Sequence, residues 1–244
     1  MILAPLLLSL MQAQWPPNSL DRPKPPVVTP APEQPAVPPP SDAVILFDGK
    51  SLADWESADS AGKPVKWLVR DGYMEVVAGA GNIRTKRGFG SAQLHIEWRA
   101  PLPATGEGQD RGNSGVFLMS HYEIQVLDSY HNDTYADGQA GAIYGQTPPL
   151  VNASRPPGQW QTYDIVFHRP VFGADGAVVR PASVTVLHNG VLVHDNDVIT
   201  GWTVHHQVAT YRPHPDRLPL LLQDHAHPVR YRNIWIRELP DSRE

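Results

Sequence analysis

Apolar and polar residues alternate in short runs along most of this chain. In residues 122–127, Tyr122, Ile124 and Val126 would face one side of a strand while Glu123 and Gln125 face the other. Turn residues separate such runs, and none of the runs keeps a helical period. We therefore predict strands at residues 44–47, 65–69, 73–77, 92–99, 115–119, 122–127, 142–144, 162–168, 183–187, 191–194, 218–223 and 231–239. Many strands with few helices predict an all-β sandwich.

Two of these segments carry additional local information. Asn189-Gly190 lies between two predicted strands and is typical of a tight hairpin, because both residues tolerate positive φ. Residues 92–99 alternate strictly, with His95, Glu97 and Arg99 on one face. That pattern is typical of a half-exposed strand, on which Glu97 and Arg99 would form a solvated pair.

The first 41 residues differ from the rest of the chain. Residues 2–11 are apolar and Ala13 offers a small residue for cleavage, which predicts a signal peptide over residues 1–13 and a secreted or periplasmic protein. This run is too short to span a membrane. Eleven prolines between residues 15 and 40 predict a disordered linker over residues 14–41, which would suit envelope association. We expect one folded domain at residues 42–240, with residues 1–40 dispensable for folding.

Composition narrows the chemistry open to this domain. A net charge of -5 and the lack of a Lys/Arg cluster argue against a nucleic-acid partner. The absence of cysteine excludes disulfides, thiolate metal sites and cysteine nucleophiles. Serine-hydrolase, P-loop and Rossmann motifs do not occur. Catalysis would therefore depend on carboxylate, His, Lys, Tyr or Ser side chains.

The strongest candidate site is the polar row formed by His121, Glu123 and Gln125. Polar groups on a buried strand are unfavourable unless they have a function. A bulge after Val126 would bring Asp128 beside Glu123, so that two carboxylates would share a cleft.

A second candidate segment is residues 220–225, in which three leucines lead into Gln223, Asp224 and His225. This pattern places polar groups at the end of a buried strand. His225, together with His121 and Glu123, could hold a divalent cation, although the HExxH spacing of zinc proteases is absent.

Motifs in a fixed order along residues 44–239 resemble the bacterial 3-keto-disaccharide hydrolase family. Gly112-Asn113-Ser114-Gly115-Val116 and the segment from Tyr122 to Asp128 are the most specific of them. The remaining motifs are residues 46–52 with Trp55, 85–86 before Phe89, 97–99, 141–144, 159–160 before Tyr163, 187–191, 222–225 and 232–236. Gln159 departs from the family pattern, which has Glu at this position.

The resemblance implies a concanavalin-like jelly-roll sandwich of two curved antiparallel sheets with a concave sugar site. It also implies a carbohydrate substrate that a separate dehydrogenase has oxidised at C3. The expected reaction is removal of the C2 proton, β-elimination of the C1 substituent and hydration. Glu123 would be the base, with His225 or Asp128 as the acid. A divalent cation is a possible cofactor, and the predicted substrate-binding residues are Lys86, Glu97, Arg99, Asn113, His121, Gln125, Tyr144 and Gln223.

Three other functions stay open at this stage. Residues 123–128 also resemble the catalytic strand of laminarinase-type β-glucanases, which would make Glu123 and Asp128 the two carboxylates of a retaining glycosidase. The same fold serves non-catalytic carbohydrate-binding modules. A structural role in the envelope rests on the Pro-rich segment alone.

Overall fold

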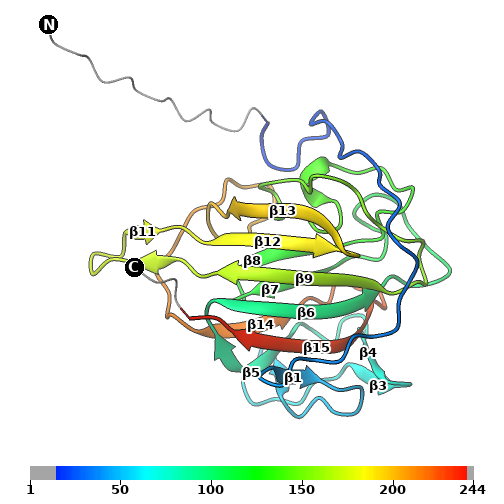
Figure 1. Ribbon diagram of the computed structural model, residues 1–244, viewed down its shortest axis with the longest axis horizontal. Coiled ribbons are helices and arrows are strands. Elements are labelled where there is room, and N and C mark those ends of the chain that lie inside the picture. Colours follow the sequence, from blue (N-terminus) through cyan, green and yellow to red (C-terminus); the bar gives the residue numbers. More distant parts are fainter. Residues whose placement is uncertain (1–14, 241–244) are drawn as a thin grey trace, which may run out of the picture.

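Antiparallel strands make up nearly all the regular structure of the computed structural model, which describes residues 15–240 (Figure 1). Within those residues the one helical element is a 3-10 turn, η1 (Ala136–Gly138). The strands are β1 (Val44–Phe47), β2 (Trp55–Ser57), β3 (Leu68–Arg70), β4 (Tyr73–Glu75), β5 (Ile83–Phe89), β6 (Ala92–Arg99), β7 (Ser114–Leu118), β8 (Tyr122–Val126), β9 (Gln161–His168), β10 (Val171–Phe172), β11 (Val178–Arg180), β12 (Ser183–His188), β13 (Val191–Val198), β14 (Leu218–Leu222) and β15 (Arg230–Glu238).

The strands form two sheets that pack face to face. The eight-stranded sheet has the order β13-β12-β9-β6-β15-β4-β3, with β1 paired to β15 (Figure 1). The five-stranded sheet has the order β2-β5-β14-β7-β8, and β10 and β11 form a separate hairpin. The predicted all-β jelly-roll sandwich is confirmed.

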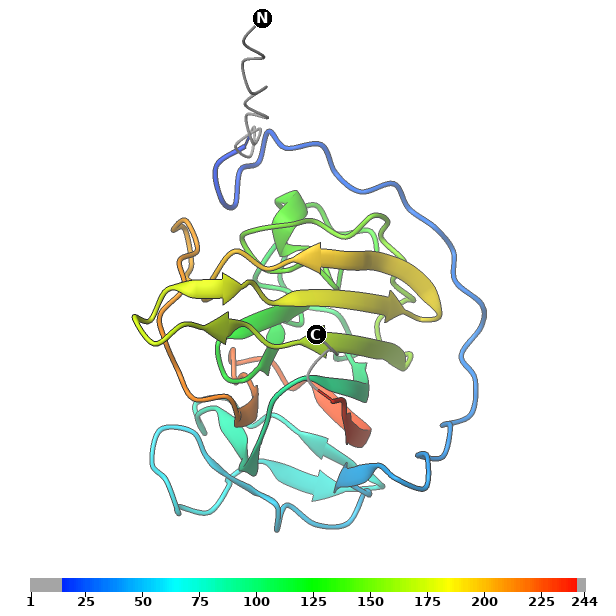
Figure 2. The ribbon, with the colours of Figure 1, turned by 60° about the vertical axis from the view of Figure 1, so that its left-hand side comes forward.

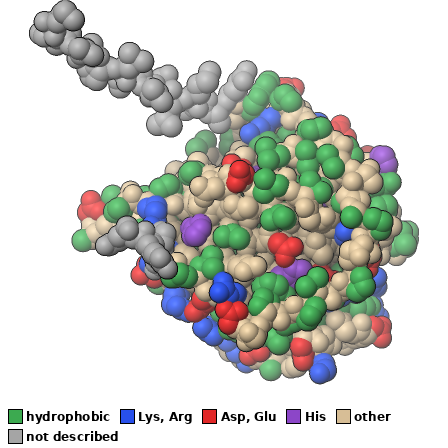
Figure 3. All heavy atoms as spheres, viewed as in Figure 1, with side chains coloured by type: hydrophobic (Ala, Val, Ile, Leu, Met, Phe, Trp, Pro, Cys, Tyr) green, Lys and Arg blue, Asp and Glu red, His purple; other side chains and the backbone are tan. Residues whose placement is uncertain are grey.

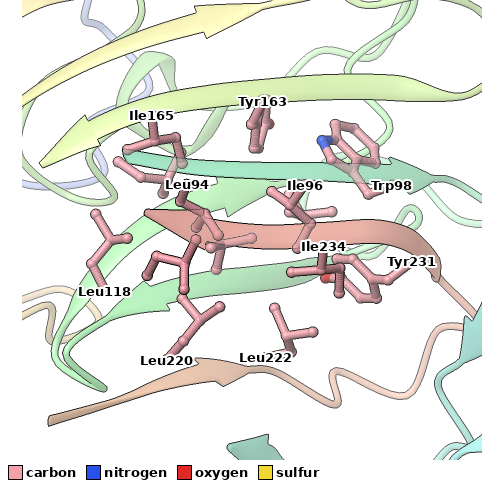
Figure 4. Packing of buried hydrophobic residues seen from close by; sticks show 14 of the residues in the cluster. Leu94, Ile96, Trp98, Leu118, Tyr163, Ile165, Leu220, Leu222, Tyr231 and Ile234 are labelled. Carbon is pink, nitrogen blue, oxygen red and sulfur yellow. The ribbon is translucent and has the colours of Figure 1, made fainter. Parts of the chain in front are cut away.

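The hydrophobic core lies between the two sheets (Figure 4). Leu94, Ile96 and Trp98 of β6 point into it, as the alternation along residues 92–99 predicts. From the other sheet, Leu118 of β7 and Leu222 of β14 pack against them (Figure 4). Because side chains alternate along a strand, the remaining side chains of β6 and β8 face away from this core, on opposite sides of the sandwich.

Strand β8 keeps an unbroken antiparallel register with β7, from Ser114 opposite Val126 to Leu118 opposite Tyr122. Tyr122, Ile124 and Val126 are fully buried in the core, so Glu123 and Gln125 point to the outer face of the five-stranded sheet. This confirms the predicted alternation. The predicted bulge does not bring Asp128 beside Glu123: the pairing of β8 with β7 ends at Val126, and the Asp128 side chain beyond it binds Arg111.

Several strands differ from those that the sequence predicts. Strand β5 was not expected, because Arg84, Lys86 and Arg87 dominate it and leave few apolar positions. Residues 142–144 do not form a named strand and contribute only isolated bridges at Ile143. Gly141 and Gly145 flank them at positive φ, which ends extended pairing on both sides. The predicted Asn189-Gly190 hairpin joins β12 to β13 with both residues at positive φ.

The Pro-rich segment lies along the outside of the domain, where Figure 2 shows its course. Its carbonyl groups accept hydrogen bonds from the domain: Arg155 Nε donates to Ala31 O at 3.1 Å, and Asn233 Nδ2 donates to Val37 O at 3.0 Å. Val28 N also donates to Asn152 O at 3.0 Å.

A disordered linker was predicted for residues 14–41, but in its described part, residues 15–41, the segment is bound to the domain through these contacts. Proline removes the backbone donor but leaves the carbonyl as an acceptor, and the arginine and asparagine side chains of the domain use it. That residues 1–40 are dispensable for folding stays a prediction, and these contacts are the ones that such a deletion would remove. The predicted signal peptide, residues 1–13, lies outside the described residues. Between residues 15 and 240, no helix has the length and apolar character needed to cross a membrane.

Candidate functional site

A cavity of about 490 Å³ opens on the outer face of the five-stranded sheet. Strands β7 and β8 form its floor, and the loops that follow β6, β8, β13 and β14 form its walls. Its volume is in the range of small-molecule sites. It is lined by Gln109, Asp110, Asn113, Phe117, Glu123, Gln125, Tyr135, Tyr144, Thr203, His205, Gln223 and His225.

Glu123 is the buried carboxyl group of this cavity. The residue is 4% exposed, and no hydrogen bond or ion pair to its carboxyl oxygens is found among residues 15–240. Burial alone raises the pKa of Glu123 to about 8. The backbone N–H of Glu123 donates to Thr203 Oγ1 at 3.0 Å, which links the strand to the loop above it. A carboxyl group with a raised pKa and no partner is suited to proton transfer near neutral pH.

Gly115 makes room for this carboxyl group. A Cβ atom at position 115 would lie 2.4 Å from Glu123 Oε1 and 2.7 Å from Phe117 Cε2. Gly115 pairs with Gln125 on the neighbouring strand β8. The Asn113-Ser114-Gly115 motif therefore has a steric role, since glycine at its third position lets the Glu123 side chain lie against the strand.

Amide side chains line one wall of the cavity, and hydrogen bonds hold their orientations. Gln125 Nε2 donates to Gln109 Oε1 at 2.9 Å, and Gln109 Nε2 in turn donates to Thr134 Oγ1 and to Gly138 O. Asn113 Nδ2 donates to Gln109 O at 2.8 Å. This network holds Gln125 and Asn113 in fixed orientations at the cavity, where amide groups can bind sugar hydroxyls.

Two tyrosines, Tyr135 and Tyr144, form a further part of the wall. The hydroxyl groups of Tyr135 and Tyr144 lie 2.6 Å apart and share a hydrogen bond. Burial raises the pKa of both phenols, and the nearby Glu123 carboxylate adds to the effect. Both hydroxyls are therefore neutral at physiological pH. One of them donates to the other, and the acceptor of that bond keeps its own O–H free to donate to a developing oxyanion.

Histidines lie at the mouth of the cavity. His225 and His205 both line it, and burial with the charges of His206 and His225 lowers the pKa of His205. Asp110 is the second acidic residue of the lining, with a side chain that is 86% exposed and an Oδ1 atom 3.2 Å from His227 Nε2. Its solvation distinguishes it from the buried Glu123.

Six predicted site residues meet in this cavity: Glu123, His225, Asn113, Gln125, Tyr144 and Gln223. Asp128 does not. Arg111 Nε donates to Asp128 Oδ2 at 2.8 Å, and the Tyr130 N–H donates to Asp128 Oδ1. The pairing of Glu123 with Asp128 is therefore corrected: Asp128 is held in a buried ion pair outside the cavity.

The predicted cationic and acidic partners of the site also lie elsewhere. Lys86 Nζ donates to Ala53 O at 2.6 Å on strand β5, three strand spacings or roughly 14 Å from β8. Glu97 and Arg99 project from the other sheet on the far side of the sandwich, because Ile96 and Trp98 fill the core. Acidic, basic and apolar side chains are interspersed over that face (Figure 3).

His121 precedes strand β8 and lies beyond the cavity. Its ring stacks on Trp202 with centroids 3.6 Å apart, and its carbonyl accepts a hydrogen bond from Thr203 N. Burial, with the charges of His214 and Arg212, lowers the pKa of His121 to about 4. It supports the loop that carries Thr203 and does not line the cavity.

Half of the cavity lining was not predicted. Gln109, Asp110, Tyr135, Thr203 and His205 come from loops, where no period marks a functional position. The sequence gives no signal for these five residues. Phe117 lies on a predicted strand and would have been identified by extending to β7 the alternation argument used for β8.

The residues present do not form a metal centre. Between residues 15 and 240 no group of three or more His, Cys, Asp or Glu side chains is placed to hold a metal ion. Glu123 is surrounded by amide and phenol groups, which are weak ligands. The chemistry below therefore includes no step on a cation.

The jelly-roll fold and the open, polar cavity with its buried carboxyl group are those of a carbohydrate-active protein, the class that the family match and a solved neighbour support. More particularly, the chain belongs to the family of 3-keto-alpha-glucoside-1,2-lyase-like domains, whose model matches residues 42–237. A proposed glycosyl hydrolase from Parabacteroides distasonis ATCC 8503 is 46% identical, with a TM-score of 0.80, and the match covers 89% of this chain and 93% of that one.

A second proposed glycosyl hydrolase from the same organism shares the fold at 20% identity. Its TM-score is 0.57, over 82% of this chain and 94% of that one. No curated protein matches the chain. Family membership and the 46%-identical neighbour support a glycoside-acting, carbohydrate-active enzyme.

Proposed function

We propose that this protein cleaves 3-keto-glycosides by elimination across C1 and C2, followed by hydration. The observation that carries the proposal is the unpaired, buried Glu123 carboxyl group, whose pKa is raised to about 8. The description of the family, a 3-keto-alpha-glucoside-1,2-lyase-like domain, supports this chemistry.

Glu123 acts as the base in this scheme. A ketone at C3 acidifies the C2 proton, and the Glu123 carboxylate removes it as the C–H electron pair moves into an enolate with its charge on O3. A carboxylate with a pKa near 8 is a far stronger base than a solvated one near 4.5. The Tyr144 hydroxyl, neutral because burial raises its pKa, is the donor that we assign to the enolate oxygen.

His225 is the acid that we assign to the leaving group. As the enolate collapses, the C3 ketone re-forms, a C1–C2 double bond forms and the bond from C1 to the glycosidic oxygen breaks. That oxygen takes a proton from His225. Water then adds at C1 and a proton returns to C2, which gives the free 3-keto sugar. Asn113, Gln125 and Gln223 bind hydroxyl groups of the sugar ring.

Direct hydrolysis by a retaining mechanism fits the site less well. That mechanism needs two carboxyl groups about 5 Å apart that flank the glycosidic bond. Asp128, the partner that the sequence offers, is bound to Arg111 outside the cavity. Asp110 is solvated at the mouth and lacks the burial that would tune it as an acid.

The substrate chemistry implies a partner activity. A C3 ketone does not arise by hydrolysis, so a separate sugar dehydrogenase must supply it. We also propose export from the cytoplasm, which rests on the apolar run at residues 2–11.

The direct test is incubation with a p-nitrophenyl 3-keto-glucoside and with its unoxidised parent. The proposal predicts release of p-nitrophenol from the keto compound alone. Cleavage of both compounds at similar rates would identify an ordinary glycosidase. Binding of either compound without cleavage would identify a carbohydrate-binding module.

A further inference from the structure

The residues that precede the matched domain reach the candidate site. Asn18 is 6% exposed, although it lies 24 residues before the first residue of the family match, residue 42. Its backbone N–H donates to Asp137 Oδ2 at 3.0 Å, and Asp137 is fully buried in η1. This bond anchors the start of the Pro-rich segment beside the cavity wall.

The Asn18 side chain contacts a loop that lines the cavity. Asn18 Oδ1 accepts a hydrogen bond from the backbone N–H of His206 at 3.0 Å. His206 follows His205, a lining residue, and Thr203 of the same loop accepts a hydrogen bond from the N–H of Glu123. Asn18 is therefore linked to the proposed base, Glu123, through a single loop, residues 203–206.

Asn18 also lies behind the tyrosine wall. A Cβ atom on Gly145 would be 3.8 Å from both terminal atoms of the Asn18 amide, so Asn18 packs directly against the residue after Tyr144. Asn18 Nδ2 is buried, and the Asn18 side chain lies close enough to the Tyr144 hydroxyl to favour its ionised form and so to lower the pKa of this phenol, against the larger effect of burial.

Arg22 extends the same contact. Its Nη1 donates to Gln146 O at 2.9 Å, while the Gln146 side chain accepts from Thr200 N at 2.7 Å and donates to Gly201 O. The segment 18–22 thus contacts both loops of this wall, residues 144–146 and 200–206. Without it, the His206 amide and Asp137 would lose their partners.

We infer that Asn18 is a positioning residue of the active site, which holds the Tyr144 and His205 walls in place over Glu123. This inference rests on the proposed function. It assigns a role in the site to a segment outside the domain that the family defines.

The test compares two full-length variants of the same kind, Asn18→Gly and Asn233→Gly. Both asparagines have positive φ, 60° and 46°, so glycine keeps either backbone without strain and removes the side chain with its carboxamide. Asn233 also contacts the Pro-rich segment, at Val37, but on the far sheet. It controls for loss of contact with the segment in general.

Amide hydrogen exchange, followed by mass spectrometry, is the first measurement. Asn18→Gly should speed exchange in peptides covering residues 200–206 and 143–146, and Asn233→Gly should leave those peptides as in the wild type. The second measurement is turnover of the p-nitrophenyl 3-keto-glucoside. Asn18→Gly should lower kcat/KM about tenfold, while Asn233→Gly keeps it within about twofold of the wild type.

Two results would overturn the inference. One is wild-type exchange at residues 200–206 in Asn18→Gly. The other is faster exchange with unchanged kcat/KM, which would mean that the contact orders the loop without serving the reaction. If the wild type cleaves no keto-glycoside, the proposed function fails, and the exchange experiment still decides whether Asn18 positions the cavity wall.

Discussion

Two buried glutamates on opposite sides of the sandwich show how environment separates a structural carboxylate from a reactive one. Glu97 of β6 and Glu123 of β8 are 2% and 4% exposed. Burial would raise the pKa of Glu97, but hydrogen bonds with His95, Asn233 and Arg232 bring it below its usual value. Arg232 Nε lies 2.6 Å from Glu97 Oε2. Glu123 has burial alone, and its pKa rises to about 8.

The difference indicates what each residue does. A paired carboxylate is stabilised in its ionised form and is a poor base, so the charge of Glu97 joins β6 to β15 and is not available for chemistry. An unpaired buried carboxyl group destabilises the fold when it ionises, and such groups are concentrated at functional sites. Glu123 fits that description, and it faces a cavity.

The largest expected effect is on turnover. Glu123→Gln keeps the size of the side chain but removes the base, and kcat on a 3-keto-glycoside should fall roughly 10²- to 10⁴-fold. Glu97→Gln is the matched control, and any folded sample of it should turn over at close to the wild-type rate. Steady-state kinetics on both variants checks the pair. Equal losses in the two variants would remove the distinction between the two glutamates.

The dependence of the reaction rate on pH should reflect the raised pKa of Glu123. The base must be ionised, so the rate of C2 proton exchange, which does not need the leaving-group acid, should increase about tenfold per pH unit until pH is near 8 and then level off. Glu97→Gln should show the same profile. A midpoint close to pH 4.5 would mean that the essential base is a solvent-exposed carboxylate and not the buried Glu123.

At pH 8 the free energy of unfolding should be higher than that of the wild type in Glu123→Gln and lower in Glu97→Gln. The folded pKa of Glu123 exceeds its unfolded value of 4.5, so ionisation destabilises the fold increasingly as pH rises from 4.5 to about 8. Urea unfolding should therefore show Glu123→Gln more stable than wild type by about 4 kcal/mol at pH 8, with no difference at pH 4.

Glu97→Gln should instead be less stable at pH 8 by about 1–3 kcal/mol, because Arg232 and His95 lose a charged partner. The loss should shrink as pH falls below 4.5, since a depressed pKa contributes stability only above the unfolded value. A destabilised Glu123→Gln at pH 8 would mean that its carboxyl group has a partner in solution.

Period-two alternation predicted the central part of the site. Because Tyr122, Ile124 and Val126 must fill the core, Glu123 and Gln125 had to share the opposite face, and the structure places both in the cavity. The polar end of the leucine-rich strand likewise gave Gln223 and His225. These predictions depend only on strand geometry and burial.

Tertiary pairing was beyond the sequence. Nothing in the pattern indicated that Arg111 would bind Asp128, or that Lys86 would lie three strands from Glu123. Proline content predicted disorder for residues 14–41, yet carbonyl groups and polar side chains of the described part of that segment bind the domain. In all three cases, the position of Asp128, the position of Lys86 and the order of the Pro-rich segment, contacts between residues far apart in the sequence determine the structure.

Deuterium incorporation tests the central claim, that Glu123 removes a carbon-bound proton. In D₂O, wild-type enzyme should introduce deuterium at C2 of a 3-keto sugar, detected by NMR, because exchange reports formation of the enolate independently of bond cleavage. Glu123→Gln should bind the sugar and leave C2 unlabelled over the same time. Wild-type labelling in Glu123→Gln would contradict the account, as would cleavage by the wild type with no deuterium at C2.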